Sequence, residues 1–229
     1  MDLILEYQSQ LVAGTWMTIN LALASLTIAL IFGFLGAWAK LSASPVARRA
    51  AGAYTTIVRG VPDLVLILLV FFGGQVTLNG IGAATGLWGY VDISKFVAGA
   101  GTIGVIFGAY FTETFRGAIM AIPRGQIEAG ISCGMRRSLI FRHIIWPQMV
   151  RFALPGFTNN WLVQLKTTAL VSVIGLQDLV YNAFTAGRSS GQLFTFMAAA
   201  FVIYLMLTGI SDLLLRALGR RYSRGVVRA

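Results

Sequence analysis

The sequence has few charged residues and almost none of the residues that usually carry catalysis or bind metals. Only 11% of its 229 residues are charged, whereas a typical soluble domain has about a quarter. There is one histidine, His143, and one cysteine, Cys133, which excludes an intramolecular disulfide and a cysteine–histidine zinc pattern. No Gly-rich phosphate-binding loop occurs either. We therefore predict no catalytic residue, no metal site and no cofactor bound by this chain.

Apolar sequence is abundant instead, at 57% of the residues. An α-helix needs about 20 mostly apolar residues to cross a bilayer. The sequence therefore predicts an all-α integral membrane protein with one transmembrane domain over residues 1–229. The acidic start and the long first apolar run argue against a cleaved signal peptide. Five spans are predicted, at about residues 15–39, 54–76, 96–115, 152–176 and 193–215.

Two of the predicted spans contain features that need an explanation. Pro62 interrupts the second span, which we expect to be a kinked helix because neighbouring groups can take over the freed carbonyl. Gly104 and Gly108 of the third span are four residues apart, a spacing that lets two helices approach closely. That helix partner lies either within this chain or in another subunit.

The basic residues fall mainly on one side of the predicted membrane. Fifteen of the eighteen Lys and Arg lie in loops on one side or in the C-terminal tail, while Lys95, Lys166 and Arg188 lie elsewhere. The positive-inside rule then places the N-terminus outside and the C-terminus in the cytoplasm. This placement accounts for the net charge of +10 without a nucleic-acid partner.

Three charged residues lie at or near membrane depth, where a charge must face a cavity, a partner or the protein interior. Asp63 and Glu113 are candidate contacts for a cationic substrate. Glu113 has the alternative of pairing with Arg116, three residues further along the same helix. Lys166 can either bind a substrate carboxylate or tie two helices together. His143 is expected to have a packing role.

Residues 124–147 form a polar, basic segment between the third and fourth spans. Residues 126–133 can form two helical turns that end at Gly134. A second short helix is expected from Ser138 to Ile145, with Pro147 as its end. Two such helices would form a hairpin on the cytoplasmic face. An ordinary interfacial loop in contact with anionic lipid is the alternative.

The spacing of this segment resembles a known family motif. Glu128-Ala129-Gly130, then Gly134, then Ile144 and Pro147 stand at the spacing of the EAA motif of ABC importer permeases. Gly130 replaces a usual Ala, and Trp146 replaces a usual Leu. In that family the motif forms coupling helices that sit in a cleft of the ATPase subunit. The resemblance thus implies contact with an ATPase through Glu128, Ala129, Gly130, Gly134, Ile144 and Pro147.

The resemblance extends over nearly the whole chain. The chain looks most similar to the polar amino acid permeases, above all the Q-type subunit of histidine/lysine/arginine/ornithine importers, with opine importers nearby. This implies a type I ABC importer permease in the bacterial inner membrane. It also implies a second permease subunit, two ATP-binding subunits that carry the ATP and Mg²⁺, a periplasmic binding protein and surrounding membrane lipid. The segments that carry the likeness are Tyr54–Asp63, Gly108–Ala118, Ala153–Gly156, Leu165–Val173 and Arg220–Ser223.

The expected function is therefore the import of basic amino acids. Import of opines or other polar amino acids is the first alternative. A secondary transporter or channel subunit would need no ATPase, and the EAA spacing argues against it. A membrane-anchored scaffold would show no substrate-dependent behaviour.

Overall fold

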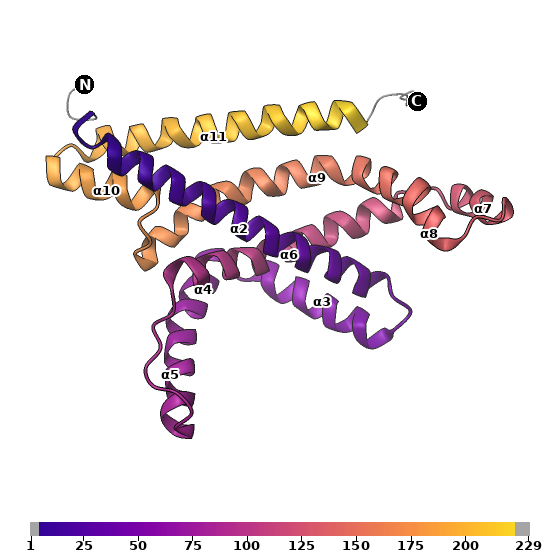
Figure 1. Ribbon diagram of the computed structural model, residues 1–229, viewed down its shortest axis with the longest axis horizontal. Coiled ribbons are helices and arrows are strands. Elements are labelled where there is room, and N and C mark those ends of the chain that lie inside the picture. Colours follow the sequence, from indigo (N-terminus) through magenta and orange to yellow (C-terminus); the bar gives the residue numbers. More distant parts are fainter. Residues whose placement is uncertain (1–4, 223–229) are drawn as a thin grey trace.

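The computed structural model describes residues 5–222, and every regular element in that range is a helix. This confirms the predicted all-α fold (Figure 1). Three stretches of different helical pitch interrupt or extend the α-helices: the π-helical turns Leu69–Gly73 and Phe141–Ile145, and the 3-10 segment Thr168–Ile174. The α-helices are α2 (Gln8–Leu41), α3 (Pro45–Gly60), α4 (Asp63–Leu68), α5 (Gly74–Thr85), α6 (Lys95–Met120), α7 (Arg124–Ser132), α8 (Arg137–Ile140), α9 (Trp146–Thr167), α10 (Leu179–Ser190) and α11 (Leu193–Tyr222).

Four helical segments are long and apolar enough to cross a membrane: α2, the continuous segment Asp63–Thr85, α6 and α11. A fifth candidate is a bent pair, in which Arg137–Ile174 and Leu179–Ser190 meet at 52°. The structure thus agrees with about five spans. The helices extend beyond the predicted spans, since α2 covers 34 residues and α11 covers 30.

The second span begins later than predicted, because Pro62 separates two helices instead of kinking one. Val61 is extended, with φ −109° and ψ 138°, and Pro62 precedes the first residue of α4. A residue before proline is pushed out of the helical region by the proline ring. Residues 54–60 consequently belong to α3, an amphipathic helix that packs on α2 and α6.

The core of the molecule is the packing of α2 against α6. A Cβ on Gly104 would lie 2.6 Å from Ile28 Cβ, and one on Gly108 would lie 2.5 Å from Phe32 Cβ. Gly33 of α2 likewise faces Phe111 of α6. Small residues on both helices therefore let the backbones approach closely. Gly104 and Gly108 therefore pack α6 against α2, a helix of the same chain.

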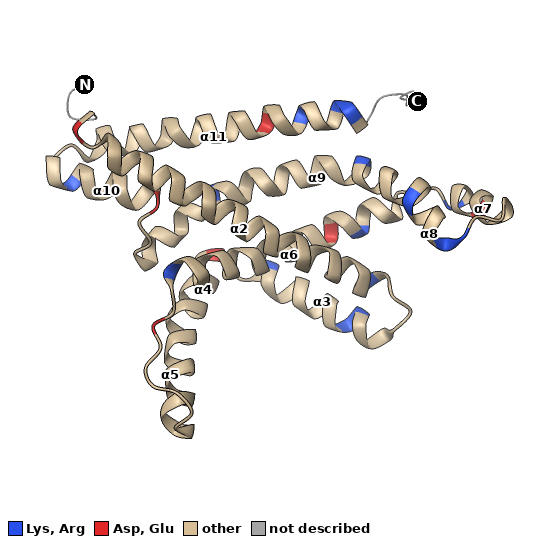
Figure 2. Ribbon diagram, in the orientation of Figure 1, with Lys and Arg blue, Asp and Glu red and all other residues tan. Residues whose placement is uncertain are grey.

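The two ends of the molecule differ. At one end α10 packs against the first turns of α2 and the first turns of α11. Asp178 caps α10 by accepting a 2.8 Å hydrogen bond from the Tyr181 N–H. At the other end lie α7 and α8, and most Lys and Arg ribbons are found in that half (Figure 2). Arg224 and Arg228, part of the predicted basic tail, lie outside the described residues. The segment α4–α5 begins with α4 packed against α6 and then projects away from the other helices at α5 (Figure 1).

Candidate functional site

The first candidate site is the hairpin formed by α7 and α8 (Figure 1). Gly134, just beyond α7, has a φ of 74°. Its N–H donates to the Ile131 carbonyl, and the Met135 N–H donates to the Gly130 carbonyl. These two bonds form a Schellman motif, which favours glycine because a Cβ would be strained at this φ. The predicted break at Gly134 is confirmed.

Gly130 lies where the two arms of the hairpin meet. It is buried, and a Cβ at this position would lie 2.9 Å from Ile144 Cδ1 and 3.3 Å from Ile140 Cγ1. Glycine therefore lets the arms approach more closely than alanine would in this arrangement. Gln148 Nε2 adds a 2.5 Å hydrogen bond to Gln126 Oε1 between α9 and α7. Gly130 and Ile144, two of the predicted coupling residues, thus hold the hairpin together.

The second arm differs from the prediction that Pro147 ends a short helix. From α8 the chain continues through the π-helical turn into α9, and Pro147 lies in the first turn of α9. A proline within a helix has no N–H to donate, and its ring crowds the preceding turn. The wider π-helical turn makes room there, and Gln148 Nε2 donates to the Ile144 carbonyl at 2.9 Å. The predicted stop is wrong, and the hairpin passes into α9 as one helix.

The outer surface of the hairpin combines a carboxylate with apolar side chains. Glu128 and Ala129 are exposed, and Ile131 is 62% exposed. On the second arm Leu139 and Phe141 are also exposed. These exposed apolar side chains and the Glu128 carboxylate are therefore available for contact with a partner. His143, the one histidine in the sequence, is exposed with Nδ1 3.1 Å from the Leu139 carbonyl oxygen.

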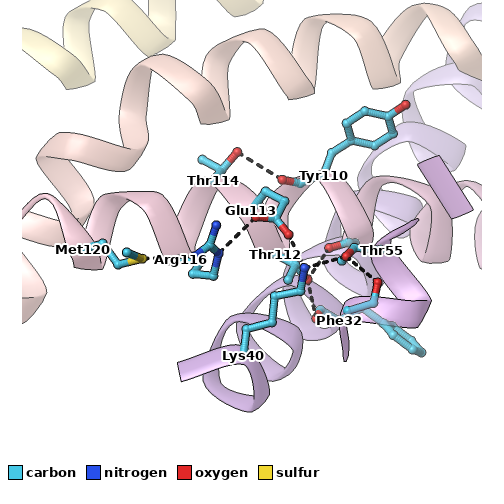
Figure 3. A network of polar contacts seen from close by, with 11 residues as sticks. Phe32, Lys40, Thr55, Tyr110, Thr112, Glu113, Thr114, Arg116 and Met120 are labelled. Carbon is cyan, nitrogen blue, oxygen red and sulfur yellow. Dashed lines mark hydrogen bonds and ion pairs between the residues drawn. The ribbon is translucent and has the colours of Figure 1, made fainter. Parts of the chain in front are cut away.

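The second candidate site surrounds Glu113, where α2, α3 and α6 meet (Figure 3). The Glu113 carboxylate pairs with Lys40 at the end of α2 and, at 3.1 Å, with Arg116 on its own helix. Lys40 also donates to Thr55 Oγ1 at 2.6 Å. The alternative pairing with Arg116 is therefore present, with Lys40 as an additional partner. Within the chain, the charge of Glu113 is already neutralised.

This network borders a polar cavity of about 340 Å³. The Arg59 guanidinium lies over the Tyr110 ring, 5.0 Å from its centroid. Lys40 and Arg59 outweigh the single carboxylate of Glu113, so the cavity does not favour a cation. Substrate contact by Glu113 stays a prediction. The cavity is lined by Lys40, Thr55, Thr56, Arg59, Gly60, Tyr110 and Glu113.

Asp63 lies apart from this network, in the first turn of α4. It is half-buried and forms no ion pair with the residues described here. Arg59 stands at helical spacing in the sequence, but the break at Pro62 places the two residues on different helices. The helix dipole stabilises a carboxylate at such an N-terminus. Of the two candidate substrate contacts, Asp63 is thus the one that forms no ion pair among the described residues.

Sequence reasoning missed a row of buried polar contacts along α9. Asn160 Nδ2 donates to Thr114 Oγ1 at 3.0 Å, and Gln164 Nε2 donates to Ser25 Oγ at 2.9 Å. The available signal was the spacing of two amides four residues apart, which places both on one helix face. Lys166, which sequence reasoning singled out, is exposed and forms no ion pair among residues 5–222.

Residues 29–224 match the family described as the inner membrane component of binding-protein-dependent transport systems. The chain is 48% identical to the histidine/lysine/arginine/ornithine transport system permease protein HisQ of Escherichia coli strain K12, over 97% of each chain. It is 43% identical to the octopine transport system permease protein OccQ of Agrobacterium tumefaciens strain Ach5, over 94% of this chain and 91% of the relative.

Two solved structures share the fold. One is described as the crystal structure of an amino acid ABC transporter with histidines, with a TM-score of 0.82 and 30% identity over 95% of this chain and 96% of that chain. The inward-facing MetNI methionine ABC transporter has a TM-score of 0.75 over 95% of this chain and 98% of that one. Its 19% identity supports the fold alone. The relatives are transport components, and ATP hydrolysis belongs to partner ATPases. The chain therefore belongs to the binding-protein-dependent transport family, as a HisQ-like multi-pass inner-membrane permease of an amino acid ABC transporter.

Proposed function

We propose that this permease imports basic amino acids. Its partners would be a second permease subunit of the M type, two ATP-binding subunits and a periplasmic binding protein. The ATP and Mg²⁺ would be bound by the ATP-binding subunits, and this chain would hold no cofactor. Residues 1–229 would act as one permease domain. The identity to HisQ over 97% of both chains is the observation that carries the proposal.

The α7–α8 hairpin is the proposed contact with the ATPase. Glu128 and Ala129 are exposed on its outer surface, while Gly130, Gly134 and Ile144 keep its two arms in place. The chain stays helical from α8 through the π-helical turn and Pro147 into α9. A movement of the hairpin can therefore be transmitted along α9, which packs against α6 and α11. Closure of the ATPase dimer would move these helices and open the pathway outward.

The proposed orientation has the hairpin and the C-terminus in the cytoplasm and the N-terminus in the periplasm. The gathering of Lys and Arg in the hairpin half supports it, because basic residues favour the cytoplasmic side (Figure 2).

The projecting α4–α5 segment supports the proposed contact with a second permease subunit. Leu69 is 64% exposed and Val76 is 74% exposed, with Phe72 between them at 55%. Apolar surface on a projecting element can pack against another membrane subunit or against lipid. We propose a heterodimer in which this segment lies against the other permease.

Asp63 is the proposed contact for the cationic group of the substrate, because its carboxylate has no partner among the described residues. Glu113 is the second choice, since it is already paired with Lys40 and Arg116. An opine is the alternative substrate class, and the 43% identity to an octopine permease supports it.

Uptake by the complete complex in proteoliposomes tests these proposals. Arginine, histidine and octopine would be compared with and without ATP. We expect ATP-dependent uptake of arginine or histidine. Asp63→Asn should raise their KM roughly tenfold to a hundredfold, because a hydrogen-bonded charge contributes about 1.5–3 kcal/mol. Uptake without ATPase subunits would refute the importer assignment. Unchanged kinetics in the Asp63 variant would remove Asp63 from the site, while preferred uptake of octopine would favour the alternative.

A further inference from the structure

A basic groove lies between α9 and the C-terminal half of α11, which run alongside each other (Figure 1). Its volume is about 590 Å³. Three arginines from two helices face one cavity here, although none of them belongs to the hairpin or to the Glu113 network. The groove is lined by Arg151, Leu154, Pro155, Thr158, Leu213, Leu215, Arg216, Gly219 and Arg220.

The groove keeps a net positive charge. Arg216 is partly neutralised, because its Nε lies 2.7 Å from Asp212 Oδ2. The Arg151 guanidinium lies over the Phe152 ring, 4.7 Å from its centroid, and a ring leaves its charge in place. Arg220 forms no ion pair with any residue of the described range 5–222. Two guanidinium groups therefore remain for an anion, and guanidinium geometry matches phosphate oxygens.

A second, apolar cavity of about 210 Å³ adjoins this groove. The two cavities share Leu154, and α11 contributes Leu218 to the apolar one and Arg216 to the basic one. A ligand with a phosphate and a hydrocarbon chain would satisfy both cavities, whereas a free phosphate would use only the basic one. The remaining wall of the apolar cavity consists of Leu30, Phe34, Phe115, Trp146, Met149, Val150, Ala153 and Phe157.

The position of the groove along α11 also suits a lipid. The uncharged run of α11 from Leu193 ends at Asp212, and Arg216 and Arg220 follow within two turns. Basic residues just beyond a spanning segment lie at the level of lipid headgroups. We propose that the groove binds an anionic phospholipid, with its phosphate between Arg151 and Arg220 and one acyl chain in the apolar cavity. The lipid would then connect α9 with the outlying helix α11.

Native mass spectrometry of the purified complex tests this proposal, with phosphatidylglycerol and phosphatidylcholine as competing probes. We expect the wild type to retain phosphatidylglycerol about tenfold better, because each Arg near an anionic headgroup adds to binding. The variant Arg151→Gln/Arg220→Gln should lose this preference. The matched control Arg48→Gln/Arg49→Gln removes two charges from α3 and should keep it.

The variant Arg151→Lys/Arg220→Lys should retain most of the preference. Counting the subunits in the same spectra shows that each variant is assembled. Inorganic phosphate should not displace the lipid. Displacement by phosphate would overturn the proposal in favour of a free anion. Equal lipid preference in the Arg151→Gln/Arg220→Gln variant and the wild type would also overturn it. An acidic segment of a partner subunit as occupant would appear as lost subunits with unchanged lipid preference.

Discussion

Glu113 shows which ion-pair partners of a charged residue near membrane depth can be predicted from the sequence and which cannot. The spacing to Arg116 indicated one partner, because residues three apart share a helix face. Lys40 stands 73 residues earlier and meets Glu113 only through the packing of α2 on α6. No local pattern predicts such a contact. Asp63 is the reverse case: Arg59 stands at helical spacing from it in the sequence, but the break at Pro62 puts Arg59 at the end of α3, over the Tyr110 ring.

If Glu113 has a structural role, Glu113→Gln leaves Lys40 and Arg116 without their carboxylate and should destabilise the protein by about 1 kcal/mol, since these side chains are partly exposed. Lys40→Gln should have a similar effect, and the double variant should lose less than the sum of the two. Thermal unfolding of the purified complex measures this coupling. Additive losses together with a raised KM for substrate would instead favour a role in substrate binding.

At the scale of helices, α2 and α6 depend on glycine at a few positions. Gly104→Ala would bring a Cβ within 2.6 Å of Ile28 Cβ and 3.1 Å of the Ser25 carbonyl, neither of which can move freely. We expect a loss of about 1–3 kcal/mol from this overpacking. Gly101→Ala on the same helix is the control, because a Cβ there meets nothing within 4 Å. Equal melting temperatures for the two variants would contradict this account of the core.

The hairpin depends on the left-handed backbone at Gly134. Gly134→Ala should strain the turn by about 1–2 kcal/mol and change how the hairpin presents Glu128. Substrate-stimulated ATP hydrolysis by the complex should fall while membrane insertion is kept. Gly125→Ala is the matched control, since Gly125 lies within α7 with open space around it and no positive φ. The coupling hypothesis fails if the Gly134 variant hydrolyses ATP and transports like the control.

The main errors in the predicted course of the helices occur at two prolines. Sequence reasoning predicted a kink at Pro62 and a helix end at Pro147, but a proline alone does not say whether a helix kinks, stops or continues. At Pro62 the preceding residue became extended and the helix broke. At Pro147 a π-helical turn supplied the room, so the helix continued. In each case the conformation of the residues before the proline decided whether the helix continued. That conformation cannot be predicted from the proline alone.

At the scale of the whole molecule, the all-α architecture was predictable because long apolar runs leave the backbone few other solutions in a bilayer. The polar contacts that hold the helices, such as Gln164 with Ser25, join residues 139 positions apart and required the structure. The hairpin was predictable in outline from Gly134. Its continuity with α9 was not.

The central claim is that the hairpin faces the cytoplasm and docks on an ATPase subunit. Cys133, the one cysteine in the sequence, is exposed at the hairpin turn beside Gly134 and offers a direct probe. A membrane-impermeant maleimide would be added to right-side-out and inverted membrane vesicles, with and without the ATPase subunits. We predict labelling in inverted vesicles only, and protection when the ATPase is assembled. Labelling of right-side-out vesicles, or equal labelling with and without the ATPase, would contradict the account.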